Sequence, residues 1–318
     1  MTTRLDIDPD NVDEICNKIK NIIGSTPRAL TVAIYNNKGG IGKTTTTINI
    51  AAALSLFKKK VLVVDFDPNQ QDLSKILKIK PAQQPFCDYL QNYKKSKIEN
   101  TISSYRLKFR NVEHPIGFDV IPADKGFLEI SPIQLGRIIN PGELHRFLSQ
   151  IKNQYDYILI DTPPNFRFFS QSALYAADVV LIPTKHNDLA SLENAAVTIK
   201  RYIPQIGDER RKKYKPEAAN TTALPIFFNG GNLNDAAQNR ANKAIKNIID
   251  QAKQAKPGCD LLPYFYPKFT QATKNTDIFT LPNSAHIPNA TFTHKPAVYT
   301  HINVRDFYKQ LVAEYFLQ

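Results

Sequence analysis

The sequence predicts a doubly wound α/β fold, in which a mostly parallel sheet carries helices on both faces. Segments with helical periodicity separate a series of short apolar runs, and a glycine-rich loop stands between the first run and the first of these helices. Apolar runs of this length are typical of parallel strands that are buried on both faces. The runs occupy residues 30–35, 61–64, 118–121, 157–160, 179–182 and 224–228.

The composition is that of a globular chain with a sizeable core. The chain has 318 residues, of which 42% are hydrophobic and 22% are charged. We find no internal repeat and no Gly/Ser-rich linker, so we expect one domain over residues 29–318, preceded by an extension over residues 1–28. Residues 78–117 are more polar and predict peripheral helices and loops.

The extension contains one predicted helix, over residues 9–23. Apolar residues recur in it at spacings of three and four, and Gly24 ends it. Two interpretations stay open: a helix packed on the main domain, or an arm that contacts a partner or a second subunit.

The cysteines and the hydropathy predict a soluble, cytoplasmic protein. Cys16, Cys87 and Cys259 are far apart and form no C-x-x-C pair, which argues against a disulfide framework or a cysteine-based metal site. The N-terminus lacks the apolar region of a signal peptide, and no apolar run is long enough to cross a membrane.

The loop at residues 36–43 has the chemistry of a phosphate site. It links the strand at 30–35 to a predicted helix at 44–56, and glycines at 39, 40 and 42 let backbone N–H groups point inward at phosphate oxygens. Lys43 is placed to reach the β- and γ-phosphates, and Thr44 to hold Mg²⁺ through its hydroxyl.

This loop departs from the common phosphate-loop pattern. Asn37 occupies the position of the first glycine, and an additional lysine, Lys38, precedes the glycine pair. The run Lys38-Gly39-Gly40-Ile41-Gly42-Lys43-Thr44-Thr45 resembles the deviant Walker A box of the ParA/MinD ATPases. The resemblance implies that ATP and Mg²⁺ are the cofactors and that Lys38 reaches the partner's nucleotide in a homodimer that sandwiches ATP. The residues expected to contact the nucleotide are Gly39, Gly40, Ile41, Gly42, Lys43, Thr44 and Thr45.

Two carboxylates follow the strand at residues 61–64. Ligand sites of open α/β sheets lie at the carboxyl ends of the strands, which is where Asp65 and Asp67 stand. The run Asp65-Phe66-Asp67-Pro68-Asn69 resembles the second ATPase motif of ParA proteins, with Asn69 in place of the usual glutamine. That resemblance implies that Asp67 orients the attacking water and that Asp65 supports the Mg²⁺ shell.

Two later strands also end in polar residues. The strand at 157–160 ends at Asp161 and resembles a Walker B strand, which places Asp161 near Mg²⁺ and makes Thr162-Pro163-Pro164 the turn that senses the γ-phosphate. The strand at 224–228 ends at Asn229, and the resemblance implies that this amide contacts the adenine edge. An ordinary turn before Gly230 and Gly231 is the alternative for Asn229.

The excess positive charge is concentrated in one region. The chain has a net charge of +12, and residues 200–256 hold twelve lysines and arginines against five acids. The predicted helix at 236–256 carries its cations opposite an apolar face, an arrangement that binds DNA phosphates without reading bases. A solvated surface is the alternative. The expected DNA contacts are Lys200, Arg201, Arg210, Arg211, Lys212, Lys213, Arg240, Lys243 and Lys246.

A membrane is the rival partner for these charges. The last predicted helix, residues 304–317, offsets Arg305 and Lys309 with Asp306 and Glu314. Its apolar face is typical of a helix docked on a core, so we expect no membrane attachment.

These motifs predict a slow, Mg²⁺-dependent ATPase of the ParA type. The resemblance implies a dimer that binds nonspecific DNA on the nucleoid and segregates a plasmid or chromosome with a ParB-like adaptor that stimulates hydrolysis. Positioning of a carboxysome-like organelle and MinD-like septum-site regulation stay open. A relative of the nitrogenase iron protein would need clustered cysteines, and a two-repeat ion pump would need a second glycine loop.

Overall fold

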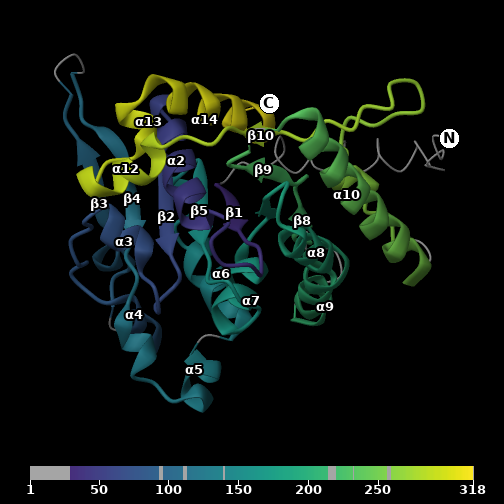
Figure 1. Cartoon of the computed structure of the whole chain (residues 1–318). Coiled ribbons are helices and arrows are strands. Elements are labelled where there is room, and N and C mark those ends of the chain that lie inside the picture. Colours follow the sequence, from purple (N-terminus) through teal and green to yellow (C-terminus); the bar gives the residue numbers. More distant parts are fainter. Residues whose placement is uncertain are drawn as a thin grey trace.

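Seven strands form the main sheet of the computed structural model, in the order β3-β4-β2-β5-β1-β6-β8 (Figure 1). All neighbouring strands run parallel except β3, which is antiparallel to β4. This arrangement confirms the predicted fold class. The structure describes residues 29–92, 96–109, 113–138, 140–213, 220–231, 233–255 and 259–317. The strands are β1 (Leu30–Ile34), β2 (Val61–Asp65), β3 (Ser103–Leu107), β4 (Ile116–Ile121), β5 (Tyr157–Asp161), β6 (Val179–Leu181) and β8 (Thr222–Ala223).

A second, shorter sheet is formed by strands that come after β6 and β8 in the chain. It has the order β10-β9-β7 and consists of β7 (Pro183–Thr184), β9 (Phe227–Asn229) and β10 (Thr280–Leu281). The strand predicted at 179–182 ends at Leu181 in β6, and of the run predicted at 224–228 only Phe227 and Phe228 lie in a strand, β9. Pro183 and Pro225 have no N–H to donate, which explains why the hydrogen-bonded ladder breaks at these places.

Helices cover both faces of the sheet, and β1 shows how the core divides between them. Leu30, Val32 and Ile34 belong to the hydrophobic cluster on one face, and Ala33 and Tyr35 to the cluster on the other. The first face is covered by α2 (Lys43–Leu56), α3 (Asp72–Ile76), α12 (His286–Thr293), α13 (Ala297–Thr300) and α14 (Ile302–Tyr315). The second is covered by α4 (Phe86–Gln91), α6 (Pro141–Ser149), α7 (Phe168–Ala176), α8 (Leu189–Val197), α9 (Ile203–Lys213), α10 (Asp235–Ala255) and α11 (Leu262–Phe265).

The periphery differs from the sequence-based expectation in one respect. Residues 78–117 were expected to hold only helices and loops, but they include β3 and the beginning of β4. Only Tyr105 of β3 is buried, because β3 is an edge strand. An edge strand needs no continuous apolar run, so its sequence lacks the signal that marks the central strands.

Other boundaries agree with the expectation or fall beyond the described residues. The helices predicted at 236–256 and 304–317 are α10 and α14. The helix predicted at 9–23, and with it the extension over residues 1–28, lies outside the described residues. Among the described helices, none combines the length and the apolar character that a membrane crossing requires.

A buried ion pair ties the start of the sheet together. Lys152 Nζ lies 3.1 Å from Asp178 Oδ2, and the two side chains are 2% and 7% exposed. The same carboxylate oxygen accepts a hydrogen bond from the backbone N–H of Thr31 at 2.9 Å. The pair thus joins the turn before β5, the turn before β6 and β1.

We expect Lys152→Met to lower the free energy of unfolding by about 3–5 kcal/mol, because it leaves the Asp178 carboxylate buried without its cation. Urea unfolding measures the change. The matched control is Lys268→Met, which breaks the exposed pair with Glu314 and should cost less than about 1 kcal/mol. Equal losses in the two variants would contradict the prediction.

Candidate functional site: a phosphate loop and three carboxylates

The glycine loop runs from the end of β1 to the start of α2. Gly39 and Gly40 are exposed, and Gly40 and Gly42 have positive φ angles of 73° and 84°. Lys43 is the first residue of α2, and its Nζ donates to the carbonyl oxygen of Lys38 at 2.9 Å. Burial lowers the pKa of Lys43, and the nearby carboxylates of Asp161 and Asp67 oppose that shift. The loop therefore holds a partly desolvated cation next to exposed glycines at a helix N-terminus, which is where phosphate groups bind.

Asp65 and Asp161 stand side by side on neighbouring parallel strands. They are register partners at the carboxyl ends of β2 and β5, and both side chains are buried. Burial, followed by the proximity of Asp65, raises the pKa of Asp161 to about 8, although a hydrogen bond from Thr44 and the charge of Lys43 oppose the shift. Burial also raises the pKa of Asp65 to about 6. Two carboxylates in this position resist simultaneous ionisation unless a cation is present.

The donor set around this pair fits a hard divalent cation. Thr44 and Thr47 on α2 direct their hydroxyls at Asp161, the latter at 3.4 Å from Oδ1. Asp65 Oδ1 is buried and has no hydrogen-bond partner among the described residues. The described residues contain no cluster of three or more His, Cys, Asp or Glu that could hold a metal. Mg²⁺ matches such a site, because it is commonly bound through one or two carboxylates together with substrate phosphates.

Asp65 also has a structural task that the sequence did not indicate. Its Oδ2 accepts hydrogen bonds from the N–H and the hydroxyl of Ser74, at 2.9 and 2.6 Å. Ser74 Oγ in turn accepts from the N–H of Ala123 at 3.0 Å. Only Oδ1 is thus left for the predicted role in the Mg²⁺ shell.

Asp67 is buried and oriented by the turn that follows it. Its Oδ1 accepts hydrogen bonds from the N–H groups of Asn69 and Gln70, at 3.1 and 3.2 Å. The Asn69 departure from the ParA pattern leaves this turn intact, because the contact uses the backbone. The carboxylate influences the pKa of Lys43 and so lies close to the phosphate loop.

Lys38 has no anchored position. Its ammonium group makes no hydrogen bond or ion pair with any residue that the structure describes. Its carbonyl, by contrast, holds Lys43. The side chain is therefore available for a group outside this chain.

Asn229 lies against the phosphate loop. Its Nδ2 donates to the carbonyl oxygen of Ile41 at 2.8 Å and lies 3.4 Å from Thr46 Oγ1. The amide nitrogen is thus engaged in bracing the loop. The predicted contact with adenine stays a prediction, and in this arrangement it would fall to the amide oxygen.

Asn36 is a site residue that the sequence analysis passed over. Its Nδ2 donates to the carbonyl oxygens of Pro183 and Ser191, both at 3.0 Å. These bonds fasten the beginning of the phosphate loop to β7 and α8. A buried asparagine between an apolar strand and a glycine loop was the available signal, but its partners are about 150 residues away.

The predicted DNA-contacting residues lie on several elements, and one of them was assigned wrongly. Arg210 is only 5% exposed, and its Nη1 donates to the carbonyl oxygen of Ala177 at 3.1 Å and to Thr221 Oγ1 at 2.7 Å. Its guanidinium also lies 5.8 Å from the centre of the Tyr175 ring. Arg210 is a buried structural cation, so the prediction that it contacts DNA was wrong.

The remaining cations lie at three places. Lys200 and Arg201 belong to a π-helical turn, Thr198–Tyr202, between α8 and α9, and Arg211, Lys212 and Lys213 are exposed at the end of α9. Arg211 pairs with Asp208, and Lys213 Nζ lies 3.5 Å from Asn140 Oδ1 before α6. The others are on α10, which packs on α8.

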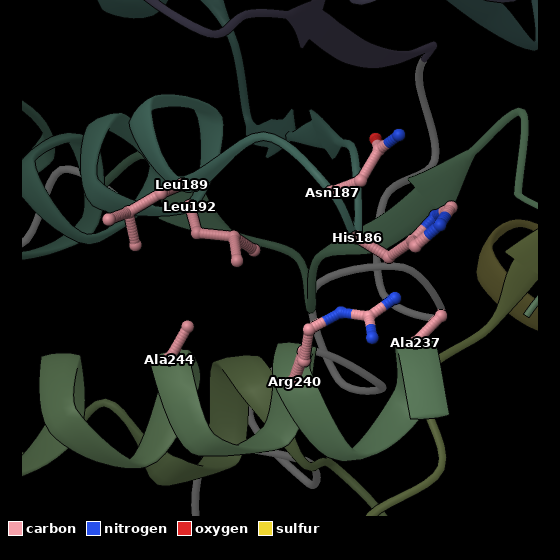
Figure 2. Close-up of a pocket in the computed structure, with 7 residues that line it drawn as sticks. All are labelled: His186, Asn187, Leu189, Leu192, Ala237, Arg240 and Ala244. Atoms are coloured by element: carbon pink, nitrogen blue, oxygen red, sulfur yellow. The ribbon is translucent and has the colours of Figure 1, made fainter. Parts of the chain in front are cut away.

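One of the α10 cations faces a groove. Figure 2 shows Arg240 directed from α10 toward His186, with Leu189 and Leu192 of α8 on the opposite wall. The cavity has a volume of about 350 Å³. Burial, together with the charge of Arg240, lowers the pKa of His186. Arg240 is exposed, and so is Lys243 one turn further along α10, which does not line the groove.

The fold and the site define a P-loop nucleotide-binding protein with a deviant phosphate loop. The family model described as AAA domain (AAA_31) matches residues 29–214. The chain belongs to the ParA/MinD family of deviant Walker A ATPases.

Curated relatives agree with this assignment. The sporulation initiation inhibitor protein Soj of Bacillus subtilis is 36% identical over 154 residues, which is 48% of this chain and 57% of Soj. The chromosome partitioning protein ParA of Myxococcus xanthus is 32% identical over 158 residues, 48% of this chain and 50% of that protein. The chain therefore spans about half the length of these relatives.

Solved structures share the fold. Apo McdA of Cyanothece has a TM-score of 0.63 at 19% identity, with coverage of 90% of this chain and 99% of that one. The septum site-determining protein MinD of Pyrococcus horikoshii, complexed with Mg-ADP, has a TM-score of 0.57 at 21% identity, with coverage of 88% and 93%.

Proposed function

We propose that this chain is an Mg²⁺-dependent ATPase that closes a homodimer around ATP and binds nonspecific DNA in the closed state. In this proposal it segregates a plasmid or chromosome with a ParB-like adaptor that stimulates slow hydrolysis. The observation that carries the proposal is the exposed phosphate loop, in which the Lys38 ammonium group has no partner among the described residues. A second copy placed over Gly39 and Gly40 would bring its own Lys38 to the phosphates.

The residues of the site divide the work of phosphoryl transfer. Lys43 neutralises charge on the phosphates, and the oriented carboxylate of Asp67 holds the attacking water. Thr44 and Asp161 would hold Mg²⁺, with Asp65 Oδ1 behind them, and the cation when bound would stabilise the charge that develops in transfer. Lys38 from the second subunit adds a cation only in the dimer, which makes hydrolysis depend on assembly.

DNA is the partner that the described surface favours. Lys243 of α10 and Arg211, Lys212 and Lys213 at the end of α9 are exposed. The apolar face of α14, by contrast, is buried through Val304, Tyr308 and Leu311 in the core beside α2. That face is not free to enter a lipid bilayer, so we propose a nucleoid-associated cytoplasmic protein in which α14 does not attach to a membrane.

The cargo distinguishes the related alternatives. The likeness to McdA and MinD concerns the fold alone and does not identify the cargo. Positioning of a protein organelle and septum-site regulation are therefore alternatives that localisation in cells tests. A fluorescent fusion that follows DNA foci supports partition. A fusion that follows a protein organelle or the division site supports an alternative.

We expect Asp67→Ala to hydrolyse ATP at least about 100-fold more slowly while it still closes the dimer, because Lys38, Lys43 and the loop remain. This variant should bind a random DNA duplex with ATP but not with ADP. Binding should weaken steeply as salt rises, since neutralised phosphates release counterions. Fluorescence anisotropy over a salt series, with light scattering for the dimer, measures both expectations.

The controls use matched lysines. Lys243→Ala in the Asp67→Ala background should weaken DNA binding several-fold, whereas Lys268→Ala, which removes a cation that pairs with Glu314, should not. A monomer with ATP, or DNA binding that is equal with ATP and ADP, would contradict the proposed cycle.

A further inference from the structure

Three aromatic rings connect the two loops that frame the phosphate site. Tyr35 directly follows β1, Phe166 lies in the loop after β5, and Tyr202 lies in the π-helical turn. The rings of Phe166 and Tyr202 are stacked, with centroids 3.8 Å apart and an interplanar angle of 8°. Tyr35 meets both rings edge-on at 6.5 Å. Tyr202 thus contacts the loop that follows Asp161 and the residue that directly precedes the phosphate loop.

The turn that carries Tyr202 is itself unusual. It interrupts one continuous helix, formed by α8, residues 198–202 and α9, with a π-helical turn. Such turns are rare and occur frequently at functional sites. Tyr202 and Phe166 are only half-buried, so filling the core does not account for the turn. It places the Tyr202 ring flat on Phe166.

The same helix also holds the phosphate loop. Asn36 Nδ2 donates to the carbonyl oxygen of Ser191 at 3.0 Å, and Asn194 Nδ2 lies 3.5 Å from the carbonyl oxygen of Asn37. Both contacts lie on α8, within three turns of Tyr202. A displacement of the phosphate loop or of the loop after β5 would therefore be transmitted to this one helix.

The cluster contains an unsatisfied polar group. The hydroxyl of Tyr35 is fully buried and has no hydrogen-bond partner among the described residues. Burial, reinforced by the proximity of Tyr202, raises its pKa, so the hydroxyl stays protonated and able to donate. A buried donor without an acceptor favours any rearrangement of the surrounding loops that supplies one.

We propose that Tyr202 is a positioning residue, which holds the loop from Thr162 to Arg167 through its stack on Phe166 and passes the nucleotide-dependent movement of that loop to Lys200 and Arg201. The inference rests on the proposed ATPase and DNA-binding function, and it links the nucleotide site to two of the proposed DNA-contacting residues. Lys200 and Arg201 belong to the same turn as Tyr202, so a shift of the stack reorients them directly.

The test is hydrogen exchange of residues 198–213, measured without DNA in the ADP state and with a non-hydrolysable ATP analogue. In the wild type, the exchange rate of this segment should differ between the ADP state and the ATP-analogue state. Tyr202→Phe, which keeps the ring, should show the same difference. Tyr202→Ala should exchange alike in both, and its kcat for hydrolysis should fall at least about tenfold with KM changed less than about threefold. Phe166→Leu removes the stack from the other side and should give the same result, which covers the case that Tyr202→Ala folds poorly.

Tyr264→Ala is the control, because it removes a half-buried aromatic that packs on the same core but makes no ring contact with Tyr35, Phe166 or Tyr202 among the described residues. It should keep the state-dependent exchange. A folded Tyr202→Ala variant with unchanged kcat and state-dependent exchange overturns the inference. A wild type that hydrolyses ATP but exchanges alike in both states overturns the inference alone, whereas a wild type that binds no nucleotide overturns the proposed function as well.

Discussion

Replacing Asp161 with asparagine is expected to lower ATP hydrolysis at least about 1,000-fold while it stabilises the nucleotide-free fold at pH 8. The loss of activity follows from the position of the carboxylate, which is the buried acid closest to Thr44 and Thr47 at the start of α2. An amide is a poor Mg²⁺ ligand and adds no negative charge beside Lys43. Initial rates at saturating Mg-ATP measure this part of the prediction.

The gain in stability follows from the raised pKa of Asp161. Its value is about 8 in the folded chain, against 3.8 for the unperturbed group. Between these values the folded state keeps a proton that the unfolded state releases, so the free energy of unfolding falls as pH rises from about 4 to 8. Asp161→Asn removes this dependence and should be more stable than the wild type at pH 8 by about 5 kcal/mol. At pH 5 the difference should be much smaller, about 1–2 kcal/mol.

Urea unfolding with EDTA at pH 5 and pH 8 tests the sign directly. Asp250→Asn is the matched control, because Asp250 is exposed on α10 and remote from the site; it should change neither stability nor hydrolysis. An Asp161→Asn variant that is less stable than the wild type at pH 8 would show that the carboxylate is ionised and satisfied in the nucleotide-free protein.

The second large effect is expected for Gly42→Ala, which should weaken ADP binding at least about 100-fold. Gly42 has φ = 84°, a conformation that side chains disfavour, and an alanine Cβ there would collide with Asn229 Nδ2. That nitrogen is not free to retreat, because it donates to Ile41 within the loop. The loop must therefore open, and about 2.7 kcal/mol of lost binding corresponds to 100-fold. Isothermal titration calorimetry with Mg-ADP measures the loss.

Two further variants separate the effect of backbone strain at a positive φ from the effect of the collision with Asn229. Gly230→Ala has a similar φ of 77° with open space around the new Cβ, so it should cost about 1 kcal/mol of stability and little binding. Asn229→Ala in the Gly42→Ala background removes the collision, and ADP binding should recover by at least about tenfold. A double variant as weak as Gly42→Ala would assign the whole effect to backbone strain.

Asp65, Asp161 and Lys43 are each held in an unfavourable state until a ligand arrives. Asp65 and Asp161 are two buried acids in register, Asp65 Oδ1 lacks a partner among the described residues, and Lys43 loses solvation next to its own loop. Phosphates and a divalent cation would relieve all three conditions, so ligand binding should raise the thermal stability markedly.

Local patterns were enough to predict the frame of this protein. The apolar runs identified the central strands because each is buried on both faces, and the run from Lys38 to Thr45 identified the phosphate loop because glycines, a lysine and a helix start lie together in the chain. Asp65, Asp67 and Asp161 were recognised for the same reason, since each stands at the end of such a strand. The meeting of Asp65 and Asp161 follows from the parallel register.

Contacts between distant segments were beyond these patterns. An arginine in a basic run reads as a surface cation, yet Arg210 is buried because Ala177 and Thr221 supply oxygens from other elements. The bonds of Asn36 and Asn229 to distant partners, the pairing of Lys152 with Asp178 and the stack of Phe166 on Tyr202 likewise join residues that only the tertiary structure brings together. The sequence by itself determined the central strands and the chemistry of the phosphate loop, because these depend on short-range spacing. The tertiary structure decided which polar groups are buried, braced or left free, because that depends on which segments pack against them.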